Sequence, residues 1–99
     1  MEALNRIELT GSVVAMDAMR YTPAGIPVVE FRLSHESTQP EAGRPRTVAI
    51  EALARAAGPA AKALSNAAPG ARVRVAGFLA PKGKSRTQLL LIVNEFEFI

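Results

Sequence analysis

Cysteine is absent from this 99-residue chain, which excludes disulfide bonds, thiolate nucleophiles and zinc sites built from cysteine. Aromatic residues are scarce, since tryptophan is missing and tyrosine occurs once. The longest aliphatic run, residues 89–93, is far too short to span a bilayer. Residues 1–6 lack the basic start and the apolar stretch of a signal peptide. We therefore expect a soluble, unprocessed, cytoplasmic protein without membrane contacts.

Negative charge is missing from much of the second half, because no acidic residue lies between Glu51 and Glu95. The net charge is only +3, but seven basic residues fall in this interval: Arg55, Lys62, Arg72, Arg74, Lys82, Lys84 and Arg86. Such asymmetry gives one side of a small domain a positive field, which favours a polyanionic partner. A solvated basic surface that maintains solubility is the alternative. Nuclease chemistry is disfavoured, since it needs clustered carboxylates to hold metal ions.

The chain is long enough for one hydrophobic core, so we expect residues 1–99 to form a single domain. Alternation of apolar and polar side chains, typical of strands with one buried face, occurs in five segments. These segments are residues 6–13, 28–34, 47–53, 72–79 and 87–98. Gly11 and Gly77 interrupt the first and fourth segments, as glycines do where a barrel strand bends. Residues 58–66 predict a short helix with proline in its first turn.

Proline, glycine and polar residues mark the connections between these elements. Residues 21–27 hold two prolines and a glycine and predict a turn, and the polar residues 38–46 predict a loop of some length. Residues 80–86 predict a basic loop before the last strand. The order of three strands, a helix and two strands is that of the OB-fold, an all-β, five-stranded barrel with a short helix between strands 3 and 4. Oligonucleotides usually bind this fold around strands 2 and 3 and at the loops joining strands 1 to 2 and 4 to 5.

The candidate nucleic-acid-binding residues lie on that face and in the loops. They are Arg20 and Tyr21 in the first loop, the outward-facing Arg32, Arg44 and Arg46 in residues 38–46, and Lys82, Lys84 and Arg86 in the last loop. Basic loop tips also occur merely to prevent edge aggregation, but their place in the fold favours binding here. Arg72 and Arg74 share an exposed strand face and either contact phosphate or are simply solvated.

The sequence contains no group of residues with the spacing of a catalytic site. His35, the only histidine, is expected at a strand end, and its neighbours Ser34 and Glu36 point to the opposite face, so the three cannot form a triad. A lone histidine also lacks the partners of a metal site, and no carboxylate pair has a spacing that suggests acid–base work. We therefore expect no enzymatic activity, no metal and no cofactor.

The last strand is apolar on both faces up to Val93. The barrel interior covers one face, and a second subunit could cover the other, which predicts a homodimer. The four phenylalanines occupy alternating apolar positions, so core packing is favoured over base stacking for most of them. They are Phe31, Phe78, Phe96 and Phe98, and Phe78 has the least clear environment.

Four short stretches carry a family resemblance. They are residues 5–11, residues 23–27 followed by Phe31 and Leu33, residues 41–43, and residues 75–78. In this order they resemble the primosomal replication protein N (PriB) family, small bacterial relatives of single-stranded DNA-binding protein, over nearly the whole chain. The resemblance implies a homodimer of OB-folds that binds single-stranded DNA without strong sequence preference and helps a restart helicase to assemble the primosome.

The resemblance implies DNA contacts near Arg20 and in the basic loop of residues 80–86. The chain departs from the family pattern at Arg44 and Ala49, where family members carry an aromatic residue and a tryptophan. Stacking on an aromatic side chain contributes about 1–3 kcal/mol per base, so we expect weaker or more electrostatic binding, with Tyr21 as a partial substitute.

Two other functions remain open, because an OB-fold does not by itself specify function. The chain could be a dimeric adaptor whose positive charge serves an acidic protein partner, or an RNA-binding domain of the translation machinery. The basic loops lie where OB-folds usually bind oligonucleotides. Together with the resemblance, they favour a single-stranded DNA-binding accessory protein of the replication-restart primosome.

Overall fold

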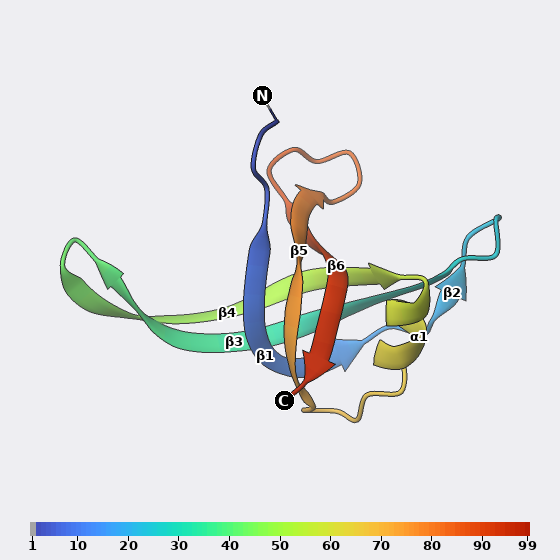
Figure 1. Ribbon diagram of the computed structural model, residues 1–99, viewed down its shortest axis with the longest axis horizontal. Helices are drawn as coiled ribbons and strands as arrows, with labels where there is room; N and C mark the ends of the chain where they lie inside the picture. Colours follow the sequence, from blue (N-terminus) through green and yellow to red (C-terminus); the bar gives the residue numbers. More distant parts are fainter. Residues whose placement is uncertain (1) are drawn as a thin grey trace.

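The computed structural model describes residues 2–99 and consists mainly of β-strands (Figure 1). The elements are β1 (Ile7–Met16), β2 (Arg20–Tyr21), β3 (Pro27–Glu41), β4 (Arg44–Ala57), α1 (Pro59–Leu64), β5 (Arg72–Pro81) and β6 (Leu89–Phe98). Each long strand overlaps one of the five segments that alternation predicts. Within residues 2–99, no helix is both long and apolar enough to cross a membrane.

Five of the strands close into a barrel in the order β1, β5, β6, β4, β3 and back to β1. β1 makes the closure, because residues 7–12 pair with β5 and residues 12–16 pair with β3. β4 and β6 pair in parallel over residues 54–56 and 91–93, and the other pairings in the barrel are antiparallel. The short β2 extends the sheet beside β3. The predicted OB-fold is confirmed, with α1 between the third and fourth barrel strands.

Two glycines allow strands to pass close to each other. A Cβ atom at Gly11 would collide with the backbone carbonyl oxygen of Ser34, and a Cβ atom at Gly77 would collide with that of Ile92. Gly77 also adjoins a register shift between β5 and β6. Both predicted bends therefore coincide with close backbone contacts that exclude any larger residue.

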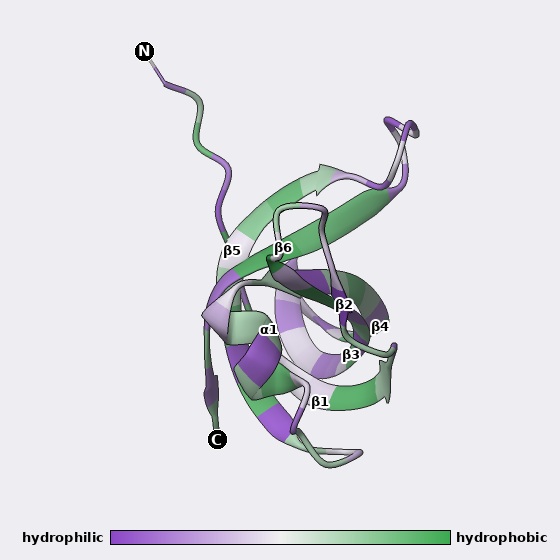
Figure 2. Ribbon diagram, turned by 90° about the vertical axis from the view of Figure 1, so that its right-hand side faces the viewer, coloured by the Kyte–Doolittle hydropathy of each residue, from purple (hydrophilic) through white to green (hydrophobic). Residues whose placement is uncertain are grey.

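The core fills the barrel with side chains from every long strand and from α1. Its largest fully buried members are Phe31, Leu33, Leu64, Val29, Val73 and Val75. The buried residues of α1, Ala61 and Leu64, belong to this cluster, so the helix caps the core as its sequence predicts. Figure 2 shows the banding of hydrophobic and hydrophilic residues along the strands that produces one buried face.

The prediction of a loop at residues 38–46 is wrong. β3 and β4 continue as one antiparallel hairpin as far as the pair Glu41 and Arg44, and only Ala42 and Gly43 form the turn. Both turn residues have positive φ, 51° and 77°, which matches the twist of a two-residue hairpin. We call residues 35–50 the arm; Figure 1 shows it extending away from the barrel.

Two prolines, which predicted the loop, are compatible with this hairpin because of their register. Pro40 faces Pro45 one position before the closing pair Glu41 and Arg44. Opposed residues in an antiparallel pair alternate between hydrogen-bonded and non-hydrogen-bonded positions, and the turn-closing pair is hydrogen-bonded. The missing N–H groups of the prolines therefore belong to positions that face away from the partner strand, where proline is tolerated.

Candidate nucleic-acid interface

A groove of about 340 Å³ lies over the outer face of the barrel where β1 ends. Its walls come from the end of β1, from β3 and β4, and from the start of the β5–β6 loop. The lining residues are Ala15, Asp17, Glu30, Phe31, Arg32, Leu53 and Lys82. In OB-folds this face, around the second and third barrel strands, is the usual place for an oligonucleotide.

Strand alternation directs Arg32 into this groove. Its neighbours Phe31 and Leu33 are 2% and 0% exposed and fill the core, so Arg32 must point outward. Leu53 is the cross-strand partner of Arg32 on β4 and supplies an apolar wall beside the guanidinium. Within residues 2–99, Arg32 forms no ion pair, which leaves its charge available.

The basic loop between β5 and β6 is shaped by its own hydrogen bonds. The backbone N–H of Lys82 donates to the Gln88 carbonyl oxygen at 2.8 Å, and the Ser85 hydroxyl oxygen accepts from the backbone N–H of Thr87 and Gln88. These bonds leave the side chains of the predicted residues exposed: Lys82, Lys84 and Arg86. Lys82 reaches the groove, and none of the three has an ion-pair partner in the described part of the chain.

Arg20 lies at the edge of the groove but is already paired. Its Nη2 donates to Oε2 of Glu30 at 2.8 Å, and the Glu30 side chain, only 19% exposed, lines the groove. The neighbouring Tyr21 is 59% exposed and pairs through its backbone with Pro27. The first loop thus presents an aromatic ring and a guanidinium whose charge is offset by a carboxylate.

Arg44 and Arg46 lie beside the turn at the tip of the arm, and neither lines the groove. The arm itself extends away from the barrel (Figure 1). Arg46 donates to Glu41 across the hairpin at 2.7 Å, while Arg44 faces Glu41 in register. The structure therefore brings together Arg32, Lys82 and, at the edge, Arg20. It separates the two arm arginines from them.

Five of the groove residues were not among the predicted site residues: Ala15, Asp17, Glu30, Phe31 and Leu53. The sequence did contain a clue to Leu53. This residue is apolar, yet alternation places it on the strand face opposite to that of Val48 and Ile50. Asp17 carried no such signal. Its backbone N–H donates to the Glu30 carbonyl oxygen at 2.9 Å, a contact that continues the antiparallel pairing of β1 with the distant strand β3.

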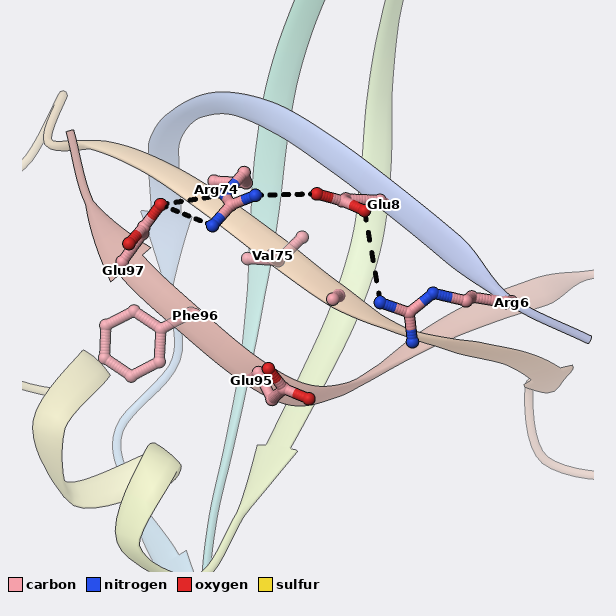
Figure 3. A pocket seen from close by; sticks show the side chains of 8 residues that line it. Arg6, Glu8, Arg74, Val75, Glu95, Phe96 and Glu97 are labelled. Carbon is pink, nitrogen blue, oxygen red and sulfur yellow. Dashed lines mark hydrogen bonds and ion pairs between the residues drawn. The ribbon is translucent and has the colours of Figure 1, made fainter.

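A second hollow of about 140 Å³ lies over β1, β5 and β6 (Figure 3). Arg74 occupies its centre and donates from Nη1 to Glu8 and from Nε to Glu97, both at 2.8 Å. The hydrogen bond to Glu97 and the charges of both carboxylates raise the pKa of the Arg74 guanidinium above its ordinary value. Two carboxylates compensate the charge of this cation, which favours an ion-pair role for Arg74 over a contact with phosphate.

His35 lies inside β3, not at the strand end that the sequence indicated. Its Nδ1 donates to the Thr10 carbonyl oxygen on β1 at 2.7 Å, and its Nε2 lies 2.7 Å from the Ser37 hydroxyl oxygen. The ring therefore ties the base of the arm to β1. Among residues 2–99, no group of three or more histidine, cysteine, aspartate or glutamate side chains could hold a metal ion.

The phenylalanines divide between the core and the surface. Phe31 is buried, and Phe96 and Phe78 are half-buried. Phe98 is 54% exposed and contacts Phe96 edge-to-face, with ring centroids 5.4 Å apart. Core packing thus fails for Phe98, which still pairs with Val73 of β5 but lies beyond the part of β6 that pairs with β4. None of the four rings offers an exposed face in the groove.

Comparison with known proteins assigns the chain to a class. Residues 5–95 match the model of a family described as "another single-strand binding protein family". The wild-type single-stranded DNA-binding protein of Thermus aquaticus has the same fold, with a TM-score of 0.75 over 97% of this chain and 50% of that chain at 23% identity. The chain therefore belongs to this single-strand binding protein family, and its barrel has the fold of the Thermus aquaticus protein.

Within this class, the chain belongs to the family of replication restart protein PriB. It is 42% identical to PriB of Bordetella pertussis, over 93% of this chain and 86% of that protein. PriB of Nitrosomonas europaea is 36% identical over 96% and 88% of the two chains. The crystal structure of PriB from Ralstonia solanacearum superposes with a TM-score of 0.87 at 35% identity, covering 97% of this chain and 98% of that one. The predicted family is confirmed, and with it the prediction that the chain is not an enzyme.

Proposed function

We propose that this protein binds single-stranded DNA in its outer groove as an accessory protein of replication restart. One observation carries the proposal: Arg32 of β3 and Lys82 of the β5–β6 loop, far apart in the sequence, converge on one groove, and neither forms an ion pair within residues 2–99. The names of its relatives, replication restart proteins, support the same role.

Binding rests mainly on phosphate contacts. Arg32 and Lys82 hold the strand in the groove, and Lys84 and Arg86 extend the positive surface along the loop. Leu53 and Ala15 give apolar contact to a base, but no aromatic ring is exposed there, so stacking is limited to Tyr21 at the edge. Phosphate contacts carry no sequence information, and binding is therefore largely independent of sequence.

The protein acts with other components of the primosome and helps to load the restart helicase. The arm is the natural element for such contacts, since it projects from the barrel and carries Arg44 at its tip (Figure 1). Its contribution in this role is to hold single-stranded DNA while its partners work.

We further propose a homodimer, but the apolar last strand, from which the sequence predicted it, is not the reason. Leu90, Leu91 and Val93 are each only 3% exposed within one chain, so most of the apolar last strand is already covered. Support comes instead from β1, whose residues 7–11 pair with β5 on one edge and have no strand partner on the other among the described residues. An unpaired edge is a template for a second chain. A monomer in sedimentation equilibrium at tens of micromolar, about the range of weak interfaces, would contradict the dimer.

Fluorescence anisotropy with single-stranded DNA, RNA and duplex probes of equal length tests the proposed function. We expect the single-stranded DNA probe to bind most tightly, with an affinity that falls steeply as salt rises. Tighter RNA binding would favour a role on RNA, and failure of every probe to bind would favour an adaptor for acidic proteins.

A further inference from the structure

We propose that Asp17 makes the groove discriminate between bases, by accepting a hydrogen bond from an exocyclic amino group. Cytosine should then bind in preference to thymine. This inference rests on the proposed binding of single-stranded DNA and adds to it a base-reading residue.

The groove has two electrostatically different sides. Arg32 and Lys82 bring positive charge, Asp17 and Glu30 bring carboxylates, and Ala15 and Leu53 are apolar. A nucleotide has three matching parts: a phosphate, the faces of the base ring, and a polar base edge. The volume, about 340 Å³, is at the low end of the roughly 300–1,000 Å³ of small-ligand sites, which suits one nucleotide.

Charge decides which way the nucleotide lies. A phosphate is attracted to Arg32 and Lys82 and repelled by Asp17, so the backbone follows the cationic side. The base edge then faces the carboxylates. In the opposite orientation the phosphate would lie beside the Asp17 carboxylate, and neither Arg32 nor Lys82 would contact a negative group.

Asp17, rather than Glu30, is free to read the base. Glu30 is engaged by Arg20 and is largely buried, whereas Asp17 is exposed and forms no ion pair within residues 2–99. The position of Asp17 is also fixed, because its backbone N–H donates to the Glu30 carbonyl oxygen at 2.9 Å. An exposed acceptor on an anchored backbone is suited to a directional contact.

The chemistry of a carboxylate determines the preference. An ionised carboxylate only accepts hydrogen bonds, and the N4 amino group of cytosine donates them. Thymine and uracil present a carbonyl oxygen at the same position, which leaves two acceptors facing each other. A site built around a hydrogen bond rejects the analogue that lacks it, because the polar group is left unpaired.

The test compares oligo(dC), oligo(dT) and oligo(dU) of about 12 nucleotides, a length within the usual site size. These probes differ mainly at C4 and C5, and dU controls for the thymine methyl group. We expect dC to bind about three- to tenfold more tightly than dT and dU, as one contact to a base edge allows. In Asp17→Asn the ratio should fall to about one, because an amide both donates and accepts.

Glu36→Gln is the matched control, since Glu36 is an exposed carboxylate on β3, next to β1, but outside the groove. Removing its charge should change the affinity for every probe by the same factor. An oligo(dC) with two methyl groups on each N4 should lose the preference with the wild-type protein, which tests the idea without any variant.

Each outcome has a separate meaning. Equal and tight binding of the unmodified probes by the wild-type protein would refute base reading by Asp17 and leave the proposed function standing. A dC preference that survives in Asp17→Asn, or in the methylated probe, would also refute it. Binding of no probe would refute the proposed function itself.

Discussion

At the scale of single residues, the pairing of each arginine decides what it can bind. Arg20 and Arg32 both lie at the groove, yet only Arg20 has a carboxylate within 2.8 Å. Glu30 also opposes Arg55 in register on β4. This carboxylate therefore offsets positive charge in a region where basic residues gather, and it weakens the attraction for phosphate.

Glu30→Gln should therefore strengthen the binding of single-stranded DNA. The substitution removes the charge that occupies Arg20, so one more phosphate can be neutralised and the slope of log affinity against log salt should steepen by about 0.7. Anisotropy titrations over a series of salt concentrations measure both quantities. Glu97→Gln, which removes a carboxylate from the β1–β5–β6 face, should leave the slope unchanged; weaker binding by Glu30→Gln would show that Glu30 supports the DNA site.

Replacing Lys82, Lys84 and Arg86 together by alanine should flatten the same slope by about 2, because each cation neutralises one phosphate at about 0.7. Stability should change little, since exposed loop substitutions usually alter it by no more than about 0.5 kcal/mol each. Tyr21→Ala provides the contrast: affinity should fall at every salt concentration with the slope intact, because stacking releases no counterions. An unchanged slope in the triple variant would exclude this loop from the DNA site.

At the scale of elements, the arm depends on its two-residue turn. Ala42 has a φ of 51°, a conformation that costs an ordinary residue about 1–2 kcal/mol, whereas asparagine adopts it readily. Gly43, with φ of 77°, has no such cost. The hairpin pairing between β3 and β4 holds Ala42 in this conformation.

Ala42→Asn should therefore stabilise the protein by about 1 kcal/mol, seen as a higher urea midpoint with an unchanged m-value. Gly43→Ala in the same turn is a control that should act in the opposite direction and lower the urea midpoint by a similar amount. If both variants matched the wild type, the turn would contribute nothing to the stability measured.

At the scale of the whole molecule, cations with and without partners occupy different surfaces. Arg74 and Arg6 are paired with carboxylates on the β1–β5–β6 face (Figure 3). Arg32 and Lys82 at the groove, and the other basic residues of the β5–β6 loop, form no ion pair in the part of the chain that the structure describes. A net charge of +3 thus becomes a local positive surface. Local concentration of charge of this kind speeds the encounter with a polyanion.

We propose that residues 1–99 form one cooperative unit, since all long strands and α1 share one core. Thermal unfolding followed by far-ultraviolet circular dichroism and by the signal of the single tyrosine should give coincident transitions. Two separate transitions would indicate that the arm or another part unfolds independently.

Sequence patterns alone identified the barrel strands, the bends at Gly11 and Gly77, the capping helix and the basic loop. Each of these depends on local information: alternation selects the buried face, and glycine marks a position where a Cβ atom does not fit. The family was also recognisable, because its short motifs recur in order along the chain.

Only the tertiary structure decided which charges are free and which residues share the groove. Arg74 pairs with Glu8 across 66 positions and Arg20 with Glu30 across 10, and no local pattern encodes such contacts. Asp17 enters the groove because the end of β1 pairs with β3 there, and the arm exists because the register of β3 and β4 tolerates Pro40 and Pro45. Local chemistry determined the elements of this protein, whereas strand pairing between distant segments determined its binding surface.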